Sequence, residues 1–157
     1  MNKGLLDVDE ALERLLAGAR PVSETETVPT LSATGRVLAV AQRSTMNVPP
    51  MDNSAMDGYA VRIADLQRPD TRLKVTQKIP AGSTGKPLAP GTAARIFTGA
   101  PIPSGADAIV MQEHCAQEGD EVVVKKVPAR GEWIRLTGSD IGAGGEVLRA
   151  GIRLRPQ

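Results

Sequence analysis

Glycine and proline divide this sequence, from Pro21 to its end, into short apolar runs. The 157 residues include sixteen glycines and twelve prolines, and both residue types mark turns and interrupt helices. Short runs without helical patterns of about ten residues between them favour a mainly antiparallel β architecture over a parallel α/β sheet. The expected strands cover residues 28–31, 37–42, 58–61, 73–79, 93–97, 106–112, 122–127, 133–135 and 147–154, and residues 32–38 could instead form one or two helical turns.

Residues 7–18 have the pattern of a short amphipathic helix. Leu12, Leu15 and Leu16 recur at spacings typical of one helix face, while Asp7 is a suitable N-cap and Gly18 a suitable stop. Because an isolated helix of this length is marginally stable in water, its leucine face must pack on the rest of the chain or on a second copy. The expected fold class is therefore mainly β with a short N-terminal helix, a β-rich α+β architecture.

Composition excludes several classes of protein. Nineteen basic residues against eighteen acidic ones give a net charge of +1, without the basic excess of most nucleic-acid-binding proteins. Apolar stretches fall far short of the roughly 18 residues that span a bilayer, and acidic residues interrupt the N-terminal apolar positions, unlike in a secretory signal. The single Cys115 and the single His114 exclude multi-cysteine and multi-histidine metal sites, and neither is assigned any chemistry. We expect no nucleic-acid partner, no membrane segment and a cytoplasmic location.

Two glycine-containing stretches look like nucleotide-binding loops but lack the required residues. Around residues 82–87, Pro80 stands where a P-loop needs its first glycine, and Pro87 stands where it needs its magnesium-binding hydroxyl. Residues 142–145 lack both the dinucleotide-binding spacing and a following helix. Both stretches are interpreted as turns.

The Asp57 loop, residues 47–58, gathers oxygen-bearing side chains. Asp52, Ser54 and Asp57 lie in a segment whose start is stiffened by two prolines, and clusters of oxygen ligands suit hard cations such as magnesium. The alternative is that these side chains only form local turns before a strand. Spacing alone favours that alternative.

Two further segments carry candidate binding groups. In the Thr98 loop, residues 98–108, Thr98 offers a hydroxyl and Gly99 permits close approach to the backbone, so the loop could hold an oxyanion; the alternative is a rigid hairpin loop. In the Arg135 segment, residues 134–141, Arg135 could bind a phosphate. Asp140 could equally pair with Arg135 as a surface salt bridge or cap a turn.

Together, the three segments resemble a known family. Residues 49–61, residues 97–113, and Ile134-Arg135 followed by residues 138–141 resemble, in order and spacing, the N-terminal part of the MoeA family of molybdopterin molybdenumtransferases. The E domain of gephyrin shares this segment. Because family members continue into a Rossmann-like α/β domain and a small C-terminal β domain, the resemblance implies a piece of a longer enzyme that turns over nothing alone.

The resemblance also implies a domain organisation. Residues 1–25 would form an N-terminal helical arm. Residues 26–47 and 137–157 would form a discontinuous β parent domain, and residues 48–136 an inserted domain that carries the two long motifs. The family's homodimeric cleft, composed from both protomers, is expected here as well.

The family reaction suggests roles for individual residues. It inserts molybdate into adenylylated molybdopterin and releases AMP with the help of a divalent cation such as Mg²⁺. By motif position, Asp57, Thr98 and Asp140 match polar residues that line the family's cleft and are the expected catalytic residues. Because both substrates are anions, Asp57 and Asp140 are also expected as magnesium ligands or as groups that position water.

Substrate binding is expected from Arg135, Ser54 and Asp52. Family members often carry a more basic run after the position of Arg135, whereas Leu136 and Thr137 follow here, which weakens the expected grip on anions. A molybdopterin adenylyltransferase is the expected protein partner. The alternative is a gephyrin-like scaffold or dimerisation module in which these loops have no catalytic role.

Overall fold

The computed structural model describes residues 6–156. The chain forms two compact units, one of Met1–Val40 with Ala150–Gln157 and one of Ala41–Arg149. The boundaries expected from the family resemblance stay a prediction, and residues 1–5 of the expected arm lie outside the described residues. Among the helices of the described residues, none is long and apolar enough to cross a membrane.

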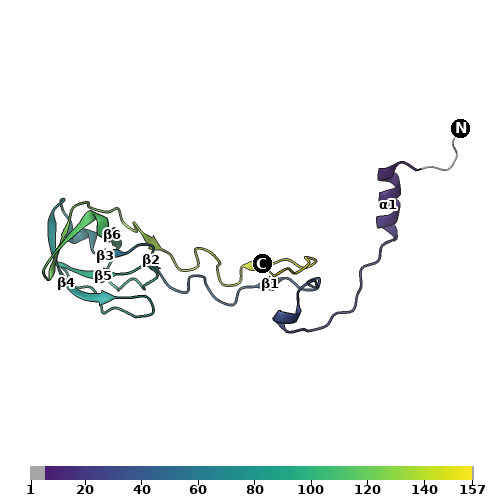
Figure 1. Ribbon diagram of the computed structural model, residues 1–157, viewed down its shortest axis with the longest axis horizontal. Coiled ribbons are helices and arrows are strands. Elements are labelled where there is room, and N and C mark those ends of the chain that lie inside the picture. Colours follow the sequence, from purple (N-terminus) through teal and green to yellow (C-terminus); the bar gives the residue numbers. More distant parts are fainter. Residues whose placement is uncertain (1–5, 157) are drawn as a thin grey trace. The chain divides into compact units, whose positions relative to one another are not determined.

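The first unit contains the predicted N-terminal helix. Helix α1 covers Val8–Gly18, and the Asp7 carboxylate caps it by accepting hydrogen bonds from the backbone N–H groups of Asp9 and Glu10 (Figure 1). None of its residues is buried. The helix and its cap are therefore confirmed, but the described residues leave its leucine face exposed.

The remainder of the first unit differs from the sequence-based expectation. The strand predicted at residues 28–31 is wrong, because a 3-10 turn, η1 (Thr30–Ser32), occupies that position, and no helical turn follows over residues 32–38. Leu31 is 98% exposed. Without a buried face to select an extended backbone, apolar character at Leu31 is a poor indicator of a strand. An isolated bridge joins Val37 to Arg153.

A curled six-stranded sheet dominates the second unit (Figure 1). Its strand order is β6-β3-β5-β4-β8-β7, and every pairing is antiparallel except that of β4 with β5. The two outer strands are consecutive in the chain and are linked by the short 3-10 turn η3 (Gln112–His114). The six strands are β3 (Gly58–Val61), β4 (Thr71–Ile79), β5 (Thr92–Ile96), β6 (Ala108–Met111), β7 (Cys115–Glu118) and β8 (Glu121–Val124).

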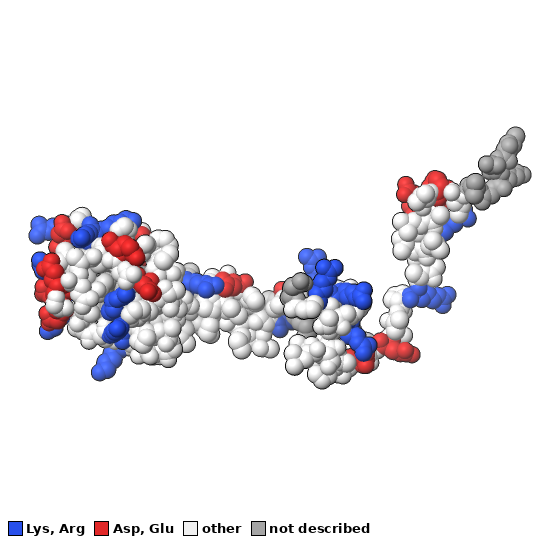
Figure 2. Space-filling model, in the orientation of Figure 1, with Lys and Arg blue, Asp and Glu red and all other residues white. Residues whose placement is uncertain are grey.

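The aliphatic side chains of this sheet form the hydrophobic core. All four residues of β3 are buried, consistent with its place between β5 and β6. One cluster includes Val61, Val122 and Val124, and a second includes Ile96 and Ile109. These side chains remove much of the chain's aliphatic surface from water, the main favourable contribution to folding. Acidic and basic side chains are interspersed on the visible surface of this unit (Figure 2).

The connections within the sheet place two of the predicted loops. Because β4 and β5 are parallel, residues 80–91 form a crossover between them, and the segment predicted as a turn at 82–87 follows a turn that the Ser83 N–H closes on the Pro80 carbonyl at 3.1 Å. The Thr98 loop is not a hairpin loop, because β3 separates β5 from β6. It leaves β5 beside Gly58, at the start of β3, and enters β6 beside Val61, at the end of β3. Its first residues therefore lie beside the Asp57 loop.

Two short ladders complete the second unit. Strand β1 (Gln42–Arg43) pairs with β10 (Glu146–Leu148), and β2 (Asn53–Ser54) pairs with β9 (Ile134–Arg135). An isolated bridge joins Val48 to Ile141 between them. The strand predicted over residues 147–154 is therefore shorter than expected. Strands β2 and β9 hold the loops that carry the predicted site residues.

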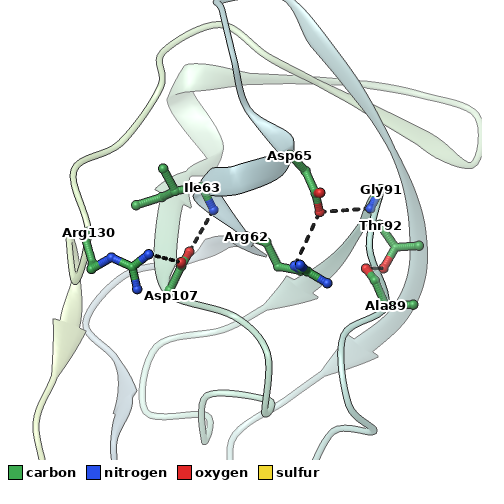
Figure 3. Close-up of polar contacts among 8 residues, drawn as sticks. All are labelled: Arg62, Ile63, Asp65, Ala89, Gly91, Thr92, Asp107 and Arg130. Atoms are coloured by element: carbon green, nitrogen blue, oxygen red, sulfur yellow. Dashed lines mark hydrogen bonds and ion pairs between the residues drawn. The ribbon is translucent and has the colours of Figure 1, made fainter.

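Two carboxylates brace the 3-10 turn η2 (Ile63–Asp65) against neighbouring loops (Figure 3). Asp107 accepts a hydrogen bond from the Ile63 N–H at 2.7 Å and lies 3.1 Å from the Arg130 guanidinium. Asp65 accepts a hydrogen bond from the Gly91 N–H at 2.8 Å. Asp107 thus uses both oxygens in structural contacts, which distinguishes it from the aspartates of the predicted site.

Candidate functional site

Strand β2 is the point at which the three predicted segments meet. Ser54 donates its N–H to the carbonyl of Ala100 and accepts the Gly99 N–H at its own carbonyl, at 2.9 and 2.8 Å. Its neighbour Ala55 donates to the carbonyl of Trp133 at 2.9 Å, and Asn53 pairs with Arg135 across the β2–β9 ladder. Backbone hydrogen bonds therefore join the Asp57 loop to both the Thr98 loop and the Arg135 segment.

Asp57 and Thr98 are in direct contact. Oδ1 of Asp57 accepts hydrogen bonds from the Thr98 N–H and from the Thr98 hydroxyl, both at 2.8 Å. The backbone N–H contributes most to holding the pKa of Asp57 below its ordinary value, followed by the hydroxyl, with a further contribution from the charge of Arg95. Oδ2 of Asp57 makes no hydrogen bond or ion pair within residues 6–156. The structure thus presents an ionised carboxylate with one oxygen fixed and one available.

Asp52 and Thr137 repeat this arrangement. Oδ1 of Asp52 accepts hydrogen bonds from the Thr137 N–H and hydroxyl, both at 2.7 Å. The N–H again contributes most to lowering the pKa of the carboxylate, followed by the hydroxyl. In addition, the Asp52 carbonyl accepts the Ile102 N–H at 3.0 Å. Asp52 therefore ties the Asp57 loop to both other segments, and Thr137, noted in the sequence only as a departure from the family, is one of its partners.

Arg135 and Asp140 form the salt bridge that the sequence left open. One guanidinium nitrogen of Arg135 donates to Oδ2 of Asp140, and both side chains are about half exposed. Because the two charges partly cancel, each side chain has a weaker electrostatic effect on a substrate than it would have alone. Oδ1 of Asp140 and the remaining N–H groups of Arg135 make no other hydrogen bond or ion pair within the part of the chain that the structure describes.

Ser54 is the one predicted site residue with a buried side chain. It is 1% exposed, and its hydroxyl donates to the Met56 carbonyl at 2.6 Å. The hydroxyl closes a turn immediately before Asp57, as serine side chains often do. Contact between Ser54 and a substrate stays a prediction, and it would require this turn to open.

Arg95 lies beside Asp57 and was not predicted from the sequence. Its Nη1 donates to the carbonyls of Gly58 and Ile96, at 2.8 and 2.7 Å, and its Nη2 donates to Gln112 Oε1 at 2.7 Å. These three acceptors fix the guanidinium next to the residue that follows Asp57. The available signal was that Arg95 is the only charged residue in the otherwise apolar run 93–97.

The two predicted magnesium ligands do not form a metal site by themselves. No hydrogen bond or ion pair joins Asp57 to Asp140, since their oxygens contact Thr98 and Arg135 respectively. Within residues 6–156, no three carboxylate, imidazole or thiol side chains gather closely enough to hold a metal ion. A divalent cation at Asp57 would therefore need ligands other than a cluster of such side chains, as magnesium often takes from water and phosphate. Burial raises the pKa of the Cys115 thiol to about 11.

Comparison with known families identifies the one to which this chain belongs. Residues 6–157 match the profile described as the MoeA N-terminal region (domain I and II). The chain belongs to the MoeA family. This match covers the three segments that β2 brings together, as well as helix α1.

MoeA relatives resemble the chain in both sequence and structure. It is 46% identical over 136 residues to the molybdopterin molybdenumtransferase of Nostoc sp., covering 83% of this chain and 31% of that protein. Identity to the molybdopterin molybdenumtransferase of Haemophilus influenzae is 39%, covering 97% of this chain and 38% of that protein. The chain thus spans well under half the length of these curated relatives.

A solved MoeA structure has the same fold. The crystal structure of the molybdopterin biosynthesis MoeA protein from Pyrococcus horikoshii superposes with a TM-score of 0.87 at 40% sequence identity. The superposition covers 95% of this chain and 41% of that one. The mainly β architecture with an N-terminal helix is therefore confirmed as a MoeA fold.

Proposed function

We propose that this chain is the N-terminal part of a molybdopterin molybdenumtransferase in molybdenum cofactor biosynthesis. The complete enzyme would insert molybdate into adenylylated molybdopterin and release AMP in the cytoplasm. Membership of the MoeA family supports this proposal, and so do the relatives that carry this name in Nostoc and Haemophilus influenzae. Because the chain spans only part of those proteins, we expect it to be inactive without the remaining domains.

The observation that carries the proposal is the contact between Asp57 and Thr98. Two hydrogen bonds fix Oδ1, lower the pKa of the carboxyl and leave Oδ2 available. An ionised carboxylate with one available oxygen can accept a hydrogen bond from a water molecule and orient it toward the phosphorus, whereas its lowered pKa makes it a weak proton acceptor. We assign this role to Asp57 in the hydrolysis that releases AMP.

Thr98 acts through Asp57 in this proposal. Its hydroxyl proton points at the Asp57 carboxylate, so donation to a substrate oxyanion would require that bond to break. Thr98 is therefore a positioning residue for Asp57. The nearby Gly99 N–H is likewise occupied, by the Ser54 carbonyl.

Arg135 and Asp140 would form the edge of the site that faces anionic substrate. The N–H groups of Arg135 that Asp140 does not use can bind a phosphate or molybdate oxygen. Asp140 limits the net positive charge at this edge and holds the guanidinium in place. Asp52 keeps the loops together through its contact with Thr137. Its second oxygen, Oδ2, is the atom that could contact a substrate.

Magnesium is the part of the proposal that depends most on the rest of the enzyme. When bound, Mg²⁺ would neutralise phosphate charge and supply a Lewis acid. Asp57 Oδ2 and Asp140 Oδ1 are the oxygens that could contribute to its coordination. Other ligands, including those of the substrate, would have to complete it, so the roles assigned above do not depend on the metal.

We propose a homodimer on the basis of helix α1. Leu15 and Leu16 are 74% and 63% exposed, and Leu12 is 52% exposed. A second copy would remove this apolar stripe from water, a gain that scales with the buried area. Sedimentation of the chain at two concentrations tests this. A dimer that a Leu16→Arg variant converts to monomer supports the proposal, whereas a wild-type monomer at both concentrations contradicts it.

The catalytic assignment can be tested in a chimera in which this chain replaces the matching N-terminal segment of the Haemophilus influenzae relative. In an active chimera, Asp57→Asn should lower AMP release by about a hundredfold or more, because the variant keeps the shape but loses the charged oxygen that orients the water. Asp120→Asn, at the exposed turn between β7 and β8, is the matched control and should stay within about twofold.

Activity of the Asp57→Asn chimera within about twofold of its parent would contradict the catalytic role. In that case the gephyrin-like alternative, a scaffold or dimerisation module, would be favoured. The proposed partner, a molybdopterin adenylyltransferase, would supply the adenylylated substrate. Its binding to the active chimera is a separate measurement.

A further inference from the structure

A hollow of about 460 Å³ lies over strands β4, β5 and β7, and its lining includes none of the residues assigned to the reaction. Residues 75–78 of β4 form one side, Gln117 of β7 contributes to its lining, and Arg95 and Phe97 close it along β5 and its exit. This volume lies within the range of sites that bind small molecules. None of its lining residues is acidic.

Two cations meet at this hollow. Lys78 and Arg95 are register partners on the parallel strands β4 and β5. Both lie over the Phe97 ring, with Lys78 Nζ at 5.2 Å and Arg95 Cζ at 4.4 Å from the ring centroid. The ring's quadrupole holds both cations without neutralising them. The lining therefore carries two positive charges and no negative charge of its own.

The two cations differ in how much of their hydrogen-bonding capacity is used. Arg95 is fixed by the carbonyls of Gly58 and Ile96 and by Gln112, which leaves its Nε and one proton of Nη2. The side-chain ammonium of Lys78 makes no hydrogen bond or ion pair within residues 6–156, so all three of its N–H donors are available. The site thus combines a rigid guanidinium with an ammonium that is free to close on a ligand.

The strand β4 is irregular where it lines the hollow. Its register with β5 shifts between Val75 and Gln77, so that Thr76 has no partner in that ladder. Bulges of this kind redirect side chains and are frequent beside binding sites. The irregularity adds the Thr76 hydroxyl and backbone to the groups that can reach a ligand.

We infer that this hollow binds a small phosphate-bearing dianion through Lys78 and Arg95. The two positive charges match a phosphate monoester, which carries between about −1.5 and −2 charges at neutral pH. Guanidinium and ammonium groups both bind phosphate oxygens, the former in a forked geometry. The inference does not rest on the proposed function, because it involves neither Asp57 nor Asp140.

The test is an NMR titration of the 157-residue chain with inorganic phosphate, with AMP and with adenosine. We expect the amides of Gln77, Lys78 and Gln117 to shift saturably with phosphate or AMP and not with adenosine. A higher affinity for AMP would identify a nucleotide as the source of the phosphate, and equal affinities would identify free phosphate.

Substitution of Lys78 makes the test specific. We expect Lys78→Gln to weaken binding about fivefold or more, the effect of losing one ion pair of about 1 kcal/mol. The matched control is Lys74→Gln, which removes the same charge from the same strand outside the hollow and should change affinity by about twofold or less. Because Lys78 is exposed and makes no ion pair, its substitution should leave the remaining amide spectrum unchanged.

Four results would overturn the inference. The first three are the absence of saturable shifts, equal weakening by Lys78→Gln and Lys74→Gln, and binding of adenosine with the same affinity as AMP. Shifts that centre on Thr98 and persist in Lys78→Gln would also overturn it, since they would place the anion in the site already described.

Discussion

The sheet of the second unit and the helix of the first use apolar residues in opposite ways. All four residues of β3 are buried, whereas no residue of α1 is buried. Strand β3 is paired along both of its edges, with β5 on one side and β6 on the other. The helix has a regular leucine stripe and a good N-cap, but its stripe remains in water. Local sequence signals thus suffice to form an element, while packing decides whether it contributes to stability.

This difference implies that the two regions respond differently to the same substitution. Changes in the sheet should alter the free energy of unfolding of the chain. Changes in α1 should alter association with another surface and leave that free energy almost unchanged. Matched pairs of substitutions, one in each region, therefore test this difference.

The largest effect is expected from a pair of glycine substitutions. A Cβ at Gly58 would lie 2.0 Å from the Val110 carbonyl oxygen, so Gly58→Ala must push β3 and β6 apart. We expect a loss of about 3 kcal/mol or more in urea denaturation. Gly18→Ala, at the end of α1, meets no atom within 4 Å and should change stability by less than about 0.5 kcal/mol. A small loss at Gly58 would contradict the close packing of β3.

A pair of aliphatic truncations should give the next largest effect. Ile109 is completely buried, and Ile109→Ala should cost about 3 kcal/mol through lost burial and the cavity that remains. Leu15 is 74% exposed, so Leu15→Ala should cost less than about 0.5 kcal/mol in the monomer. Urea denaturation at low protein concentration measures both. Equal losses would contradict the exposure of the Leu15 side chain.

The smallest effect is expected from pH. Partners in the folded state lower the pKa of Asp52 and of Asp57, chiefly the N–H groups of Thr137 and Thr98. Their stabilising contribution is therefore fully present above the unfolded pKa of about 3.9 and is lost as pH falls through the lower folded values. Thermal unfolding should show a drop in melting temperature between about pH 5 and pH 3 that is smaller in an Asp52→Asn, Asp57→Asn double variant. An identical drop would contradict these contacts.

Most of the sheet was predictable because its strands are short, apolar and bounded by turn residues. Residues 58–61 were predicted without error, and residues 73–79 and 93–97 nearly so. Strand β7 was missed because Cys115–Glu118 is mostly polar and lies at the sheet edge. Strand β2 was missed because its extended backbone depends on tertiary partners. The parallel pairing of β4 with β5 likewise depends on a crossover that local pattern does not specify.

The predicted site shows the same limit. Residue chemistry and motif position in the family resemblance identified Asp57, Thr98, Arg135 and Asp140 as candidates, and the contacts between them are now defined. The sequence offered the pair of Arg135 with Asp140 as one alternative. The contact of Asp57 with Thr98 could not be predicted, because it depends on a loop that connects β5 to β6 past β3. The role of Thr137 as the partner of Asp52 was missed for the same reason, since the two are 85 residues apart.

The central claim is that Asp57 and Thr98 act as one catalytic unit. A double-mutant cycle in the active chimera tests it most directly, with AMP release as the measurement. We expect Thr98→Val to slow release by about tenfold, Asp57→Asn by about a hundredfold or more, and the double variant by no more than Asp57→Asn alone, since residues that act as a unit are strongly non-additive. Losses that multiply, or a double variant close to the parent rate, would contradict the claim.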